Sequence, residues 1–527
     1  MTVRALRRIA LGALLLAAVP SVHAQTPEAS FEVTRVRVSG HTVFTTEELH
    51  LLVAPAEGRR LALAELEAFA ARITERYVGA GYLLARATVP PQDVVDGVVE
   101  IRVVEGTIGR VDVRGARRYD PELLRSYFRF RDPPVFDAAA IDRGLLLLND
   151  LPGLTVAATL NAGQAPGTTD VVLDVTRERW FSGSLELDNY GAAATGRERF
   201  GMALNFNNPF GIGDVISLRG LVTLDDLDLE RVAYAVPLGR WGTKLEASYT
   251  HVRAEAGGAA VAGLGIVGSG HLANVVVTHP VVRERALTLV GIAGFLYKDL
   301  ETTVLNDSAN RDRLRVASAG AALDVTDAWR GRTSGLLTLH QGIGDLFDGQ
   351  HGDHDRHASR VGAGGTFTKL TADTSRLQGL GETTALFVRG SGQWSSRRLD
   401  ASEQFIVGGQ GTVRGYPLAE ASGDWGYAVT VELRWNAPGF ADRPAFFGKT
   451  WGDLLQVFVF TDHGGIVVKD PAPGGNRVTD LTGAGLGTRF VIPERLSVAL
   501  EYAKPVDGPR PSDRRQDVFY FQVIVPF

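Results

Sequence analysis

Two short motifs in the C-terminal third of the chain carry residue types that can form a specific ion pair. The first is glycine-rich, Gly408-Gly409 followed by Thr412-Val413-Arg414-Gly415-Tyr416, and it supplies a guanidinium group. The second, Phe460-x-Asp462-x-Gly464, supplies a carboxylate. A guanidinium can donate two parallel N–H groups to one carboxylate, which makes such a pair strong and directional. Either motif alone is short, so its meaning depends on the elements that carry it.

Signatures of catalysis or metal binding are weak in this chain. None of the 11 histidines lies in a His-Glu-x-x-His arrangement, and Gly-x-Ser-x-Gly is absent. His351, His354 and His357 occupy a polar, Asp-rich stretch, which favours a solvated loop over a metal site. Gly268-Ser269-Gly270 is interpreted as loop composition, because no helix follows that could hold a phosphate. We therefore expect no enzyme activity, no catalytic residue, no metal and no cofactor.

The elements that position the two motifs belong to a long C-terminal part, residues 180–527. All seven tryptophans lie there, and the apolar residues recur with period 2. In Val429–Trp435, for example, apolar residues alternate with Thr430, Glu432 and Arg434. A soluble sandwich would also alternate, but its dry core would leave such charges unpaired. Apolar-out and polar-in strands predict a transmembrane antiparallel β-barrel, and 348 residues at about 20–22 per strand and connection give about sixteen strands.

The same alternation assigns a face to Asp462. This residue shares parity with Phe458 and Phe460 and opposes Val457 and Val459. A charge is acceptable only on the inner face of such a barrel, so Asp462 is expected to face the lumen. Residues 403–423 are rich in glycine and lack strand periodicity, which predicts a loop around Arg414.

The last nine residues, Phe519–Phe527, alternate with an aromatic or aliphatic residue at every second position and end in phenylalanine. A soluble protein would leave this terminus as an exposed apolar edge unless it were a buried strand. We interpret it as the final strand of the barrel. Beyond the N-terminus no apolar run reaches 18 residues, which excludes a helical membrane protein.

The overall composition narrows the functional classes further. The 527-residue chain has no cysteine, a net charge of −5 and 45% hydrophobic residues. These values exclude a disulfide scaffold and a disordered chain, and they give no general signature of nucleic-acid binding.

The N-terminus predicts a secretory signal peptide over residues 1–24. Arg4, Arg7 and Arg8 precede the apolar stretch Ile9–Val19, which is too short to span a membrane, and Val22-His23-Ala24 suits a signal peptidase. The mature protein is therefore expected to cross the inner membrane.

Residues 31–178 read as two small modules with the same order of strand, helix, helix, strand and strand. In the first, residues 31–105, Thr45-Thr46-Glu47-Glu48 forms a capping box, and a longer helix carries Leu66, Phe69, Ile73 and Tyr77 on one face. Its strands are expected at Phe31–Val38, Leu83–Val89 and Val98–Val104.

The second module, residues 106–178, repeats this order. Asp120-Pro121 and Asp137 are expected to start its two helices. Its strands are expected at Ile108–Val113, Thr155–Leu160 and Asp170–Val175. Two copies of one supersecondary unit indicate a tandem array, and each copy is large enough for only a small core.

With these features in place, the mature chain resembles the two-partner secretion transporters of Gram-negative outer membranes, the haemolysin and haemagglutinin secretion/activation family. The resemblance implies two α+β POTRA domains followed by the barrel. Besides the two motifs above, the residues that carry it are Tyr77–Leu83, Val89–Gly97, Leu145–Gly153, Pro166–Asp170, Asp188–Gly191, Thr195-Gly196, Asn208–Gly211 and Gly213-Asp214.

The resemblance also implies roles for the two motifs. The loop motif Val413, Arg414, Gly415 and Tyr416 would lie at the tip of an extracellular loop that folds back into the lumen. Its arginine would contact Asp462 on the inner wall, within the motif that also contains Phe460 and Gly464. Several relatives begin with a helix that plugs the barrel, whereas only Gln25–Ser30 separates the expected cleavage site from the first module here. We therefore expect no plug helix, which leaves the folded-in loop as the main obstruction.

The function implied is the translocation of an exported protein across the outer membrane. The POTRA domains, in the periplasm, would capture the unfolded partner by strand addition, and the partner would pass through the lumen as the loop yields. The expected partners are a large secreted protein of the haemolysin or adhesin kind, outer-membrane lipids and lipopolysaccharide, and the barrel assembly machinery during biogenesis, but no nucleic acid. An alternative is an assembly factor that inserts barrel proteins; a passive porin is disfavoured by the two modules.

Overall fold

The computed structural model describes residues 30–130, 134–224, 227–257 and 264–527. They form two units, one ending at Thr107 and the other running from Ile108 to Phe527. The expected signal peptide and most of the segment that follows it lie outside the described residues. Among the helices described, none is long and apolar enough to cross a bilayer.

The first unit is a small α+β module. Helix α1 begins at the expected capping box, in which Thr45 accepts from the backbone N–H of Glu48, and α2 buries Leu66, Phe69, Ile73 and Tyr77 as its spacing predicts. The expected strand Phe31–Val38 is divided in two, and its first half pairs with a strand that the sequence did not reveal. The elements are β1 (Ser30–Val33), β2 (Arg35–Ser39), α1 (Thr46–Val53), β3 (Arg59–Ala62), α2 (Leu63–Gly79), β4 (Arg86–Thr88) and β5 (Val98–Val104).

The sheet of this unit has the order β2-β5-β4, with β2 parallel to β5 and β4 antiparallel to it. A buried polar group closes the module beside β5. The Glu105 carboxylate accepts from Thr42 Oγ1, from the Tyr77 hydroxyl at 2.7 Å and from the Val43 backbone N–H at 2.9 Å. These donors replace the water that the carboxylate loses on burial.

The second unit contains a module with the same strand, helix, helix, strand and strand order but, in its described residues, without counterparts of β1 and β3. Asp120 and Asp137 cap its helices as expected, each accepting from a backbone N–H of the first turn. The sheet order is β6-β8-β7, and apolar residues such as Leu124, Phe136, Leu148 and Leu173 form its core. The elements are β6 (Thr107–Arg114), α3 (Pro121–Arg125), α4 (Ala138–Asn149), β7 (Leu154–Ala162) and β8 (Thr168–Glu178).

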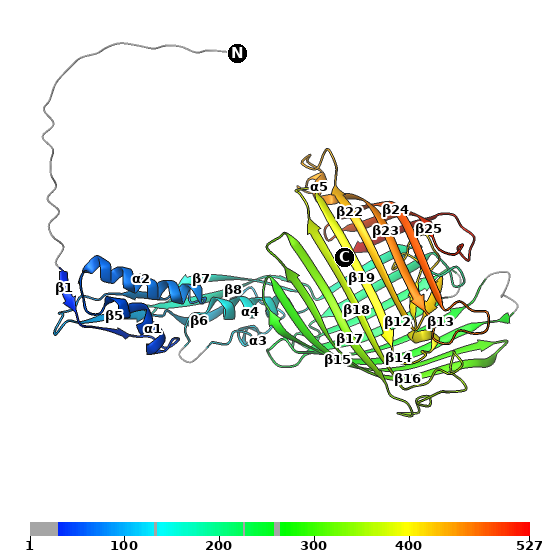
Figure 1. The fold of residues 1–527 in the computed structure, drawn as a ribbon, viewed down its shortest axis with the longest axis horizontal. Coiled ribbons are helices and arrows are strands. Elements are labelled where there is room, and N and C mark those ends of the chain that lie inside the picture. Colours follow the sequence, from blue (N-terminus) through cyan, green and yellow to red (C-terminus); the bar gives the residue numbers. More distant parts are fainter. Residues whose placement is uncertain (1–29, 131–133, 225–226, 258–263) are drawn as a thin grey trace, which may run out of the picture. The chain divides into compact units, whose positions relative to one another are not determined.

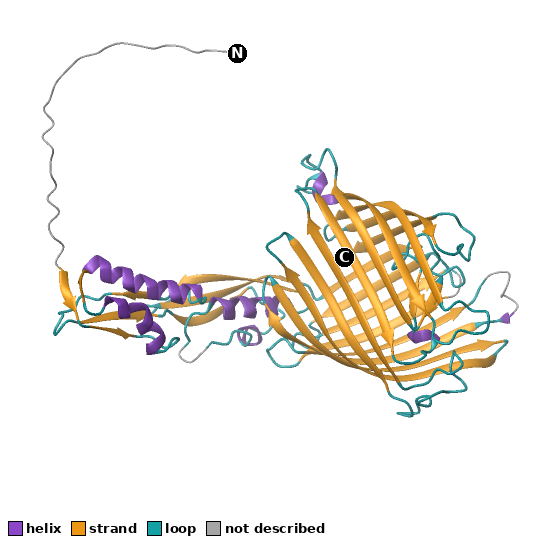
Figure 2. Cartoon of the chain, in the orientation of Figure 1, coloured by secondary structure: helices purple, strands orange, loops and turns teal. Residues whose placement is uncertain are grey.

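In the part of the chain that the structure describes, sixteen antiparallel strands close into a barrel, as the sequence predicts (Figures 1 and 2). The last strand pairs with the first, so no edge is left open. The strands are β9 (Phe181–Asp188), β10 (Arg199–Asn207), β11 (Val215–Thr223), β12 (Leu227–Pro237), β13 (Lys244–Glu255), β14 (Val267–Arg283), β15 (Leu287–Val304), β16 (Asp307–Thr326), β17 (Gly331–Gly342), β18 (Phe367–Gly379), β19 (Thr384–Ser395), β22 (Trp425–Asn436), β23 (Leu455–Val467), β24 (Val478–Ile492), β25 (Leu496–Asp507) and β26 (Val518–Pro526).

One sequence interpretation is wrong here. Gly268-Ser269-Gly270 was expected in a loop but lies within β14, paired with both neighbouring strands. Small residues fit there because the strands pack closely: a Cβ at Gly270 would lie 2.3 Å from a Leu300 methyl carbon. Glycine therefore marks close packing at this point, not a turn.

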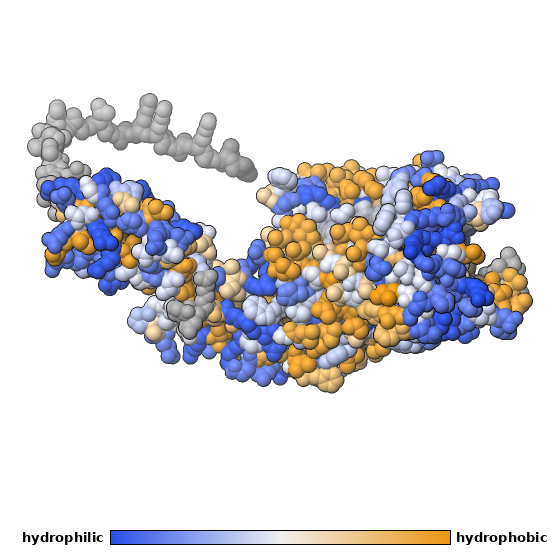
Figure 3. Space-filling model, turned by 60° about the horizontal axis from the view of Figure 1, so that its bottom comes forward, coloured by the Kyte–Doolittle hydropathy of each residue, from blue (hydrophilic) through white to orange (hydrophobic). Residues whose placement is uncertain are grey.

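The barrel wall alternates as the period-2 pattern predicts. On β22 and β23, Val429 and Val459 point outward and are exposed, whereas Glu432 and Asp462 point inward and are buried. On the face of the barrel that Figure 3 shows, hydrophobic residues gather over its middle part, with hydrophilic residues beyond them. An apolar exterior and a polar interior are what hydrocarbon outside and a hydrated lumen require.

Two neighbouring strands are unusually long, β15 with 18 residues and β16 with 20. Near the turn that joins them, after Val304 and before Asp307, ionisable side chains appear on the outward face of the wall. One row of directly paired positions crosses five strands there, from β12 to β16, and consists of Glu230, His251, His271, Asp299 and Arg313. The adjacent outward row contains Val232, Tyr249, Ala273 and Tyr297, and its member on β16 is Arg315, which is buried over the Tyr297 ring beneath the Phe347 carbonyl.

The two ends of the barrel differ. At one end, which we call the turn end, most connections are short, and the second module lies against them through ion pairs such as Arg283–Asp150. At the opposite end, the loop end, longer connections occur, among them residues 343–366, 396–424 and 468–477.

Candidate functional site

The longest connection at the loop end, residues 396–424, folds inward against the inner wall of the barrel. It contains a short ladder between β20 (Phe405–Val407) and β21 (Ala421–Gly423), so the expected loop is a hairpin at its base. Its tip, residues 408–416, packs on inward-facing residues of β23 and β24. Three-residue strands carry too little periodicity to be read from sequence, which is why the ladder was missed.

Arg414 at the tip contacts Asp462 on the inner wall in a bidentate arrangement. Its Nε donates to Asp462 Oδ2 at 2.7 Å and its Nη2 to Oδ1 at 2.9 Å, while its backbone N–H adds a third bond at 3.1 Å. Arg414 is 3% exposed and Asp462 is 0% exposed. The guanidinium also stacks on the Phe460 ring, with Cζ 3.3 Å from the ring centroid.

Two further carboxylates share this guanidinium. Nη1 of Arg414 donates to Glu432 at 2.9 Å and to Glu501 at 3.1 Å, and both glutamates are buried. Arg434 and Arg489 in turn bind Glu432, at 2.7 and 3.1 Å. Three arginines thus face three carboxylates, so the cluster is neutral as a whole although each member is costly to bury alone.

The remaining motif residues allow the tip of the loop to pack closely against the barrel wall. Val413 and Tyr416 are buried, and the Tyr416 hydroxyl donates to the Asp507 carbonyl at 3.0 Å. Gly415 has φ +97°, and a Cβ there would lie 2.7 Å from the Lys504 carbonyl carbon on β25. A Cβ at Gly464 would lie 3.0 Å from a Val413 methyl carbon. The structure therefore brings all seven motif residues into one contact region.

Sequence reasoning did not single out the glutamates and arginines that complete this cluster. The signal was present, since Glu432 and Arg434 occupy the polar face of Val429–Trp435 and Glu501 that of Leu496–Tyr502. The alternation of residues along each strand places these side chains in the lumen. Which charged side chains then contact one another depends on strand register and barrel closure, and a single sequence does not reveal these.

A second buried cluster holds the start of the loop. Glu403 accepts from Lys298 of β15 and Lys369 of β18, each at 2.5 Å, and Gln393 of β19 donates to the Glu403 carbonyl at 2.9 Å. Burial raises the pKa of the Glu403 carboxyl, but the two ammonium groups lower it by more and hold it well below its usual range. Through these contacts Glu403 holds the start of the loop to β15, β18 and β19.

These two clusters hold the loop against the inner wall through ion pairs. No group of three histidine, aspartate or glutamate side chains within the described ranges is placed to hold a metal ion. His351 and His357 are exposed in the connection 343–366 and pair with Asp345 and Asp355. The chemistry available is therefore reversible ion pairing inside a polar lumen.

Comparisons with known proteins agree with this architecture. A family described as haemolysin secretion/activation protein ShlB/FhaC/HecB matches residues 167–490, and a POTRA domain of the ShlB type matches residues 31–106.

Individual relatives cover most of the chain. The heme/hemopexin transporter protein HuxB of Haemophilus influenzae (strain 86-028NP) is 23% identical over 91% of this chain and 85% of its own length. The outer membrane transporter CdiB of Escherichia coli O6:K15:H31 is 26% identical over 79% of this chain and 71% of its own. The solved structure of CdiB from Escherichia coli has the same fold, with a TM-score of 0.78 at 22% identity, over 97% of this chain and 93% of that one.

Proposed function

Because the chain belongs to the haemolysin secretion/activation family, whose members are outer-membrane transporters of secreted partner proteins and not enzymes, we propose how this transporter works. Its POTRA domains, in the periplasm, bind the unfolded partner, and the barrel passes it outward when the loop tip leaves the wall. The observation that carries this proposal is the anchoring of Arg414 by three buried carboxylates.

The way the loop is held supports a removable obstruction. The wall is held by continuous backbone ladders, whereas the tip at Arg414 is held largely by side-chain ion pairs and one small apolar cluster. A charged or polar group of a passing chain can replace a side-chain partner in these pairs, whereas a broken ladder would leave backbone groups unpaired in the membrane. The loop would thus yield while the barrel stays intact.

The first unit offers an edge for an extended peptide. Strand β4 pairs with β5 on one side, and in the described residues no strand pairs with its other side. Apolar side chains are exposed around it, among them Leu83, Leu84 and Val104. An unfolded chain could add a strand there through backbone hydrogen bonds, with its alternate side chains meeting these residues.

The partner proposed is a large secreted protein, of the kind that the names of the relatives HuxB, CdiB and the hemolysin transporter HpmB indicate for those proteins. We keep the divisions 31–105, 106–178 and 180–527 as the working domains. Outer-membrane lipid and lipopolysaccharide around the apolar band, and the barrel assembly machinery during biogenesis, complete the proposed set of partners.

The test is secretion of a large secreted partner protein produced together with this chain, in cells that contain either the parent or a variant lacking residues 31–105. We expect the variant to lose secretion while its barrel still shows heat-modifiable gel mobility, because the barrel strands lie entirely in the other unit. Export at the parental level by a folded variant would show that the first module is not the site of capture.

A further inference from the structure

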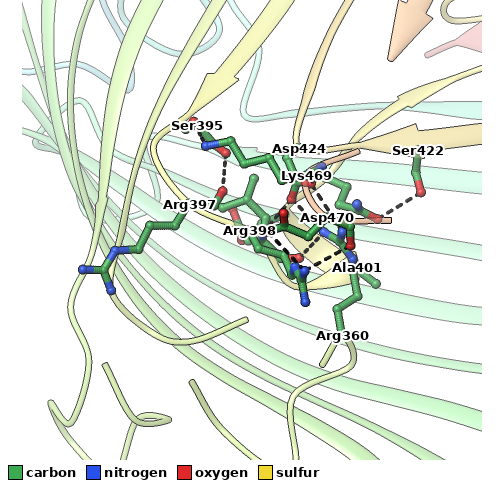
Figure 4. Close-up of polar contacts among 12 residues, drawn as sticks. Arg360, Ser395, Arg397, Arg398, Ala401, Ser422, Asp424, Lys469 and Asp470 are labelled. Carbon is green, nitrogen blue, oxygen red and sulfur yellow. Dashed lines mark hydrogen bonds and ion pairs between the residues drawn. The ribbon is translucent and has the colours of Figure 1, made fainter. Parts of the chain in front are cut away.

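The base of the 396–424 loop is held by a buried carboxylate that no motif contains. Asp424 is 0% exposed and immediately precedes β22. Its Oδ1 accepts from the Leu399 backbone N–H and from Arg360 Nη1, both at 2.7 Å. Its Oδ2 accepts from the Lys469 backbone N–H at 2.7 Å and from Arg360 Nη2 at 3.3 Å; Figure 4 shows Arg360 and Lys469 beside Asp424. Both oxygens are therefore fully used.

These contacts join three connections at the loop end. Leu399 lies near the start of the loop that Asp424 ends, Arg360 belongs to residues 343–366, and Lys469 belongs to residues 468–477. The side chain of Lys469 adds bonds to the carbonyls of Ser395 and Ser396, at 2.9 and 2.7 Å. Figure 4 shows Arg360, Lys469 and Ser395 around Asp424.

The bond between Leu399 and Asp424 closes the neck of the loop. Inside the neck, β20 and β21 pair from Phe405 with Gly423 to Val407 with Ala421. The neck and this ladder together make residues 399–424 a closed hairpin whose far end carries Arg414. The base is built partly from backbone bonds and continues the β22–β23 ladder, because the Asp424 N–H donates to the Val467 carbonyl at 3.0 Å. The tip lacks such a continuation.

We propose that Asp424 is a positioning residue that, together with the Glu403 anchor, fixes the base of the hairpin at the mouth of the barrel, so that residues 405–423 move as one body about that base. The position of its carboxylate determines where the hairpin begins and thereby whether Arg414 reaches Asp462. The three connections around it form a cap that stays assembled while the tip contacts open. This inference rests on the proposed function only in taking the lumen as the path of transport.

The first experiment measures ion conductance of the purified full chain in planar bilayers, which requires no partner. Asn in place of Asp424 keeps the shape but turns an NH2 group toward N–H donors, which breaks the pin. We expect Asp424→Asn to raise the open probability at least several-fold while gel mobility stays heat-modifiable. An open probability equal to that of the parent would overturn the proposal.

Arg360 variants keep this test meaningful if Asp424→Asn does not fold. Arg360→Gln removes the cation and should also raise the open probability, whereas Arg360→Lys retains it and should return the value toward that of the parent. The matched control is Asp348→Asn, in the same connection as Arg360, because that carboxylate is exposed and pairs with Arg313 away from the pin. If Arg360→Lys opens as much as Arg360→Gln, the charge at this position does not pin the loop.

The second experiment asks whether the hairpin moves as one body. The chain has no cysteine, so Ile406→Cys with Ser422→Cys introduces a single possible disulfide between directly opposite positions of β20 and β21. We expect oxidised and reduced forms to secrete the partner equally, within about twofold. Secretion that stops on oxidation and returns on reduction would show that the hairpin unzips, and would overturn the proposal. If the parent itself secretes no partner, the proposed function fails while the conductance test still decides the role of Asp424.

Discussion

Two regions of the second unit use the same pair chemistry in opposite surroundings. In the lumen, Arg414 and Asp462 form a bidentate pair with almost no exposure. At the turn end, where the second module meets the barrel, Arg285 and Asp142 also form a two-bond pair, but their side chains are 70% and 44% exposed. Water competes for the second pair and not for the first.

An intermediate case at the same junction makes the comparison quantitative. Arg283 binds Asp150 through two bonds of 2.8 and 2.9 Å, and the side chains are 20% and 33% exposed. The length of the hydrogen bonds hardly changes from the lumen to the junction, whereas solvent access does. The difference teaches that the ion pairs of this molecule should be ranked by burial and not by geometry.

The largest effect is expected in the lumen. Arg414→Ala leaves Asp462, Glu432 and Glu501 close together with one fewer cation, and one-sided loss of a buried pair costs about 3–5 kcal/mol where water is excluded. We expect a loosened loop, lower secretion and noisier conductance without loss of heat-modifiable mobility. Asp462→Ala should act similarly, and the double variant should be no worse than either single one, as a double-mutant cycle would show.

The matched control is Arg389→Ala, which removes another inward-facing arginine of the wall whose nearest carboxylate lies 3.7 Å away and half exposed. It should leave conductance close to that of the parent. If the effects of Arg414→Ala and Asp462→Ala on secretion simply add, the two residues act independently. That result would contradict the view that the buried luminal pair is strongly coupled.

The first module tests whether burial needs a counter-ion. Glu105 is buried among neutral donors; burial raises its pKa, but the bonds from Thr42, Tyr77 and Val43 lower it by more, to below the usual value for glutamate. Its stabilisation is therefore present above the pKa of an unfolded glutamate, about 4.3, and is lost as pH falls through the lower folded pKa.

The substitution Glu105→Gln should cost about 1–3 kcal/mol at pH 7, because the amide cannot accept from all of these donors. It should also flatten the loss of stability on acidification. Pulse proteolysis of the first module in the intact protein, between pH 7 and pH 3.5, measures both. A module with equal acid sensitivity in parent and variant would show that Glu105 does not carry the pH dependence.

A smaller effect is expected from Arg283→Ala at the junction. The pair with Asp150 is only partly shielded, so its loss should cost about 1 kcal/mol. Hydrogen exchange at the end of α4, next to Asp150, should therefore accelerate about fivefold, with no change in the barrel strands. If hydrogen-exchange protection at the end of α4 fell by orders of magnitude, this partly exposed pair would contribute as much as the buried luminal pair, and the ranking by burial would be wrong.

The smallest effect is expected from Arg285→Ala. Its pair with Asp142 is open to solvent, so exchange in α4 should not change measurably at physiological salt. Raising the ionic strength of the parent should mimic the substitution, because salt screens exposed charges. A clear effect of Arg285→Ala at high salt would contradict the ranking by burial.

Much of this architecture is predictable because it repeats along the chain. Period-2 alternation in segments such as Val429–Trp435 predicts the barrel wall, the length of residues 180–527 gives the number of strands, and the local caps at Thr45, Asp120 and Asp137 mark the helices of the modules. The inward direction of Asp462 follows in the same way.

What sequence reasoning missed depends on contacts between distant segments. The β1–β3 pair, the Lys298–Glu403 contact and the Asp424 pin join residues that no local period connects. Gly268-Ser269-Gly270 misled for a related reason: glycine marks turns and close strand packing alike, and only the neighbouring strands distinguish the two.

The long hairpin β15–β16 indicates how far the hydrocarbon of the bilayer reaches along the barrel. A tilted strand needs only about 9–11 residues to cross the hydrocarbon, so strands of 18 and 20 residues must extend beyond it. The ionisable row from Glu230 to Arg313 cannot sink into acyl chains without a large penalty, so the hydrocarbon must end below it. The rim of the barrel is consequently uneven, and the side formed by β15 and β16 extends beyond the hydrocarbon.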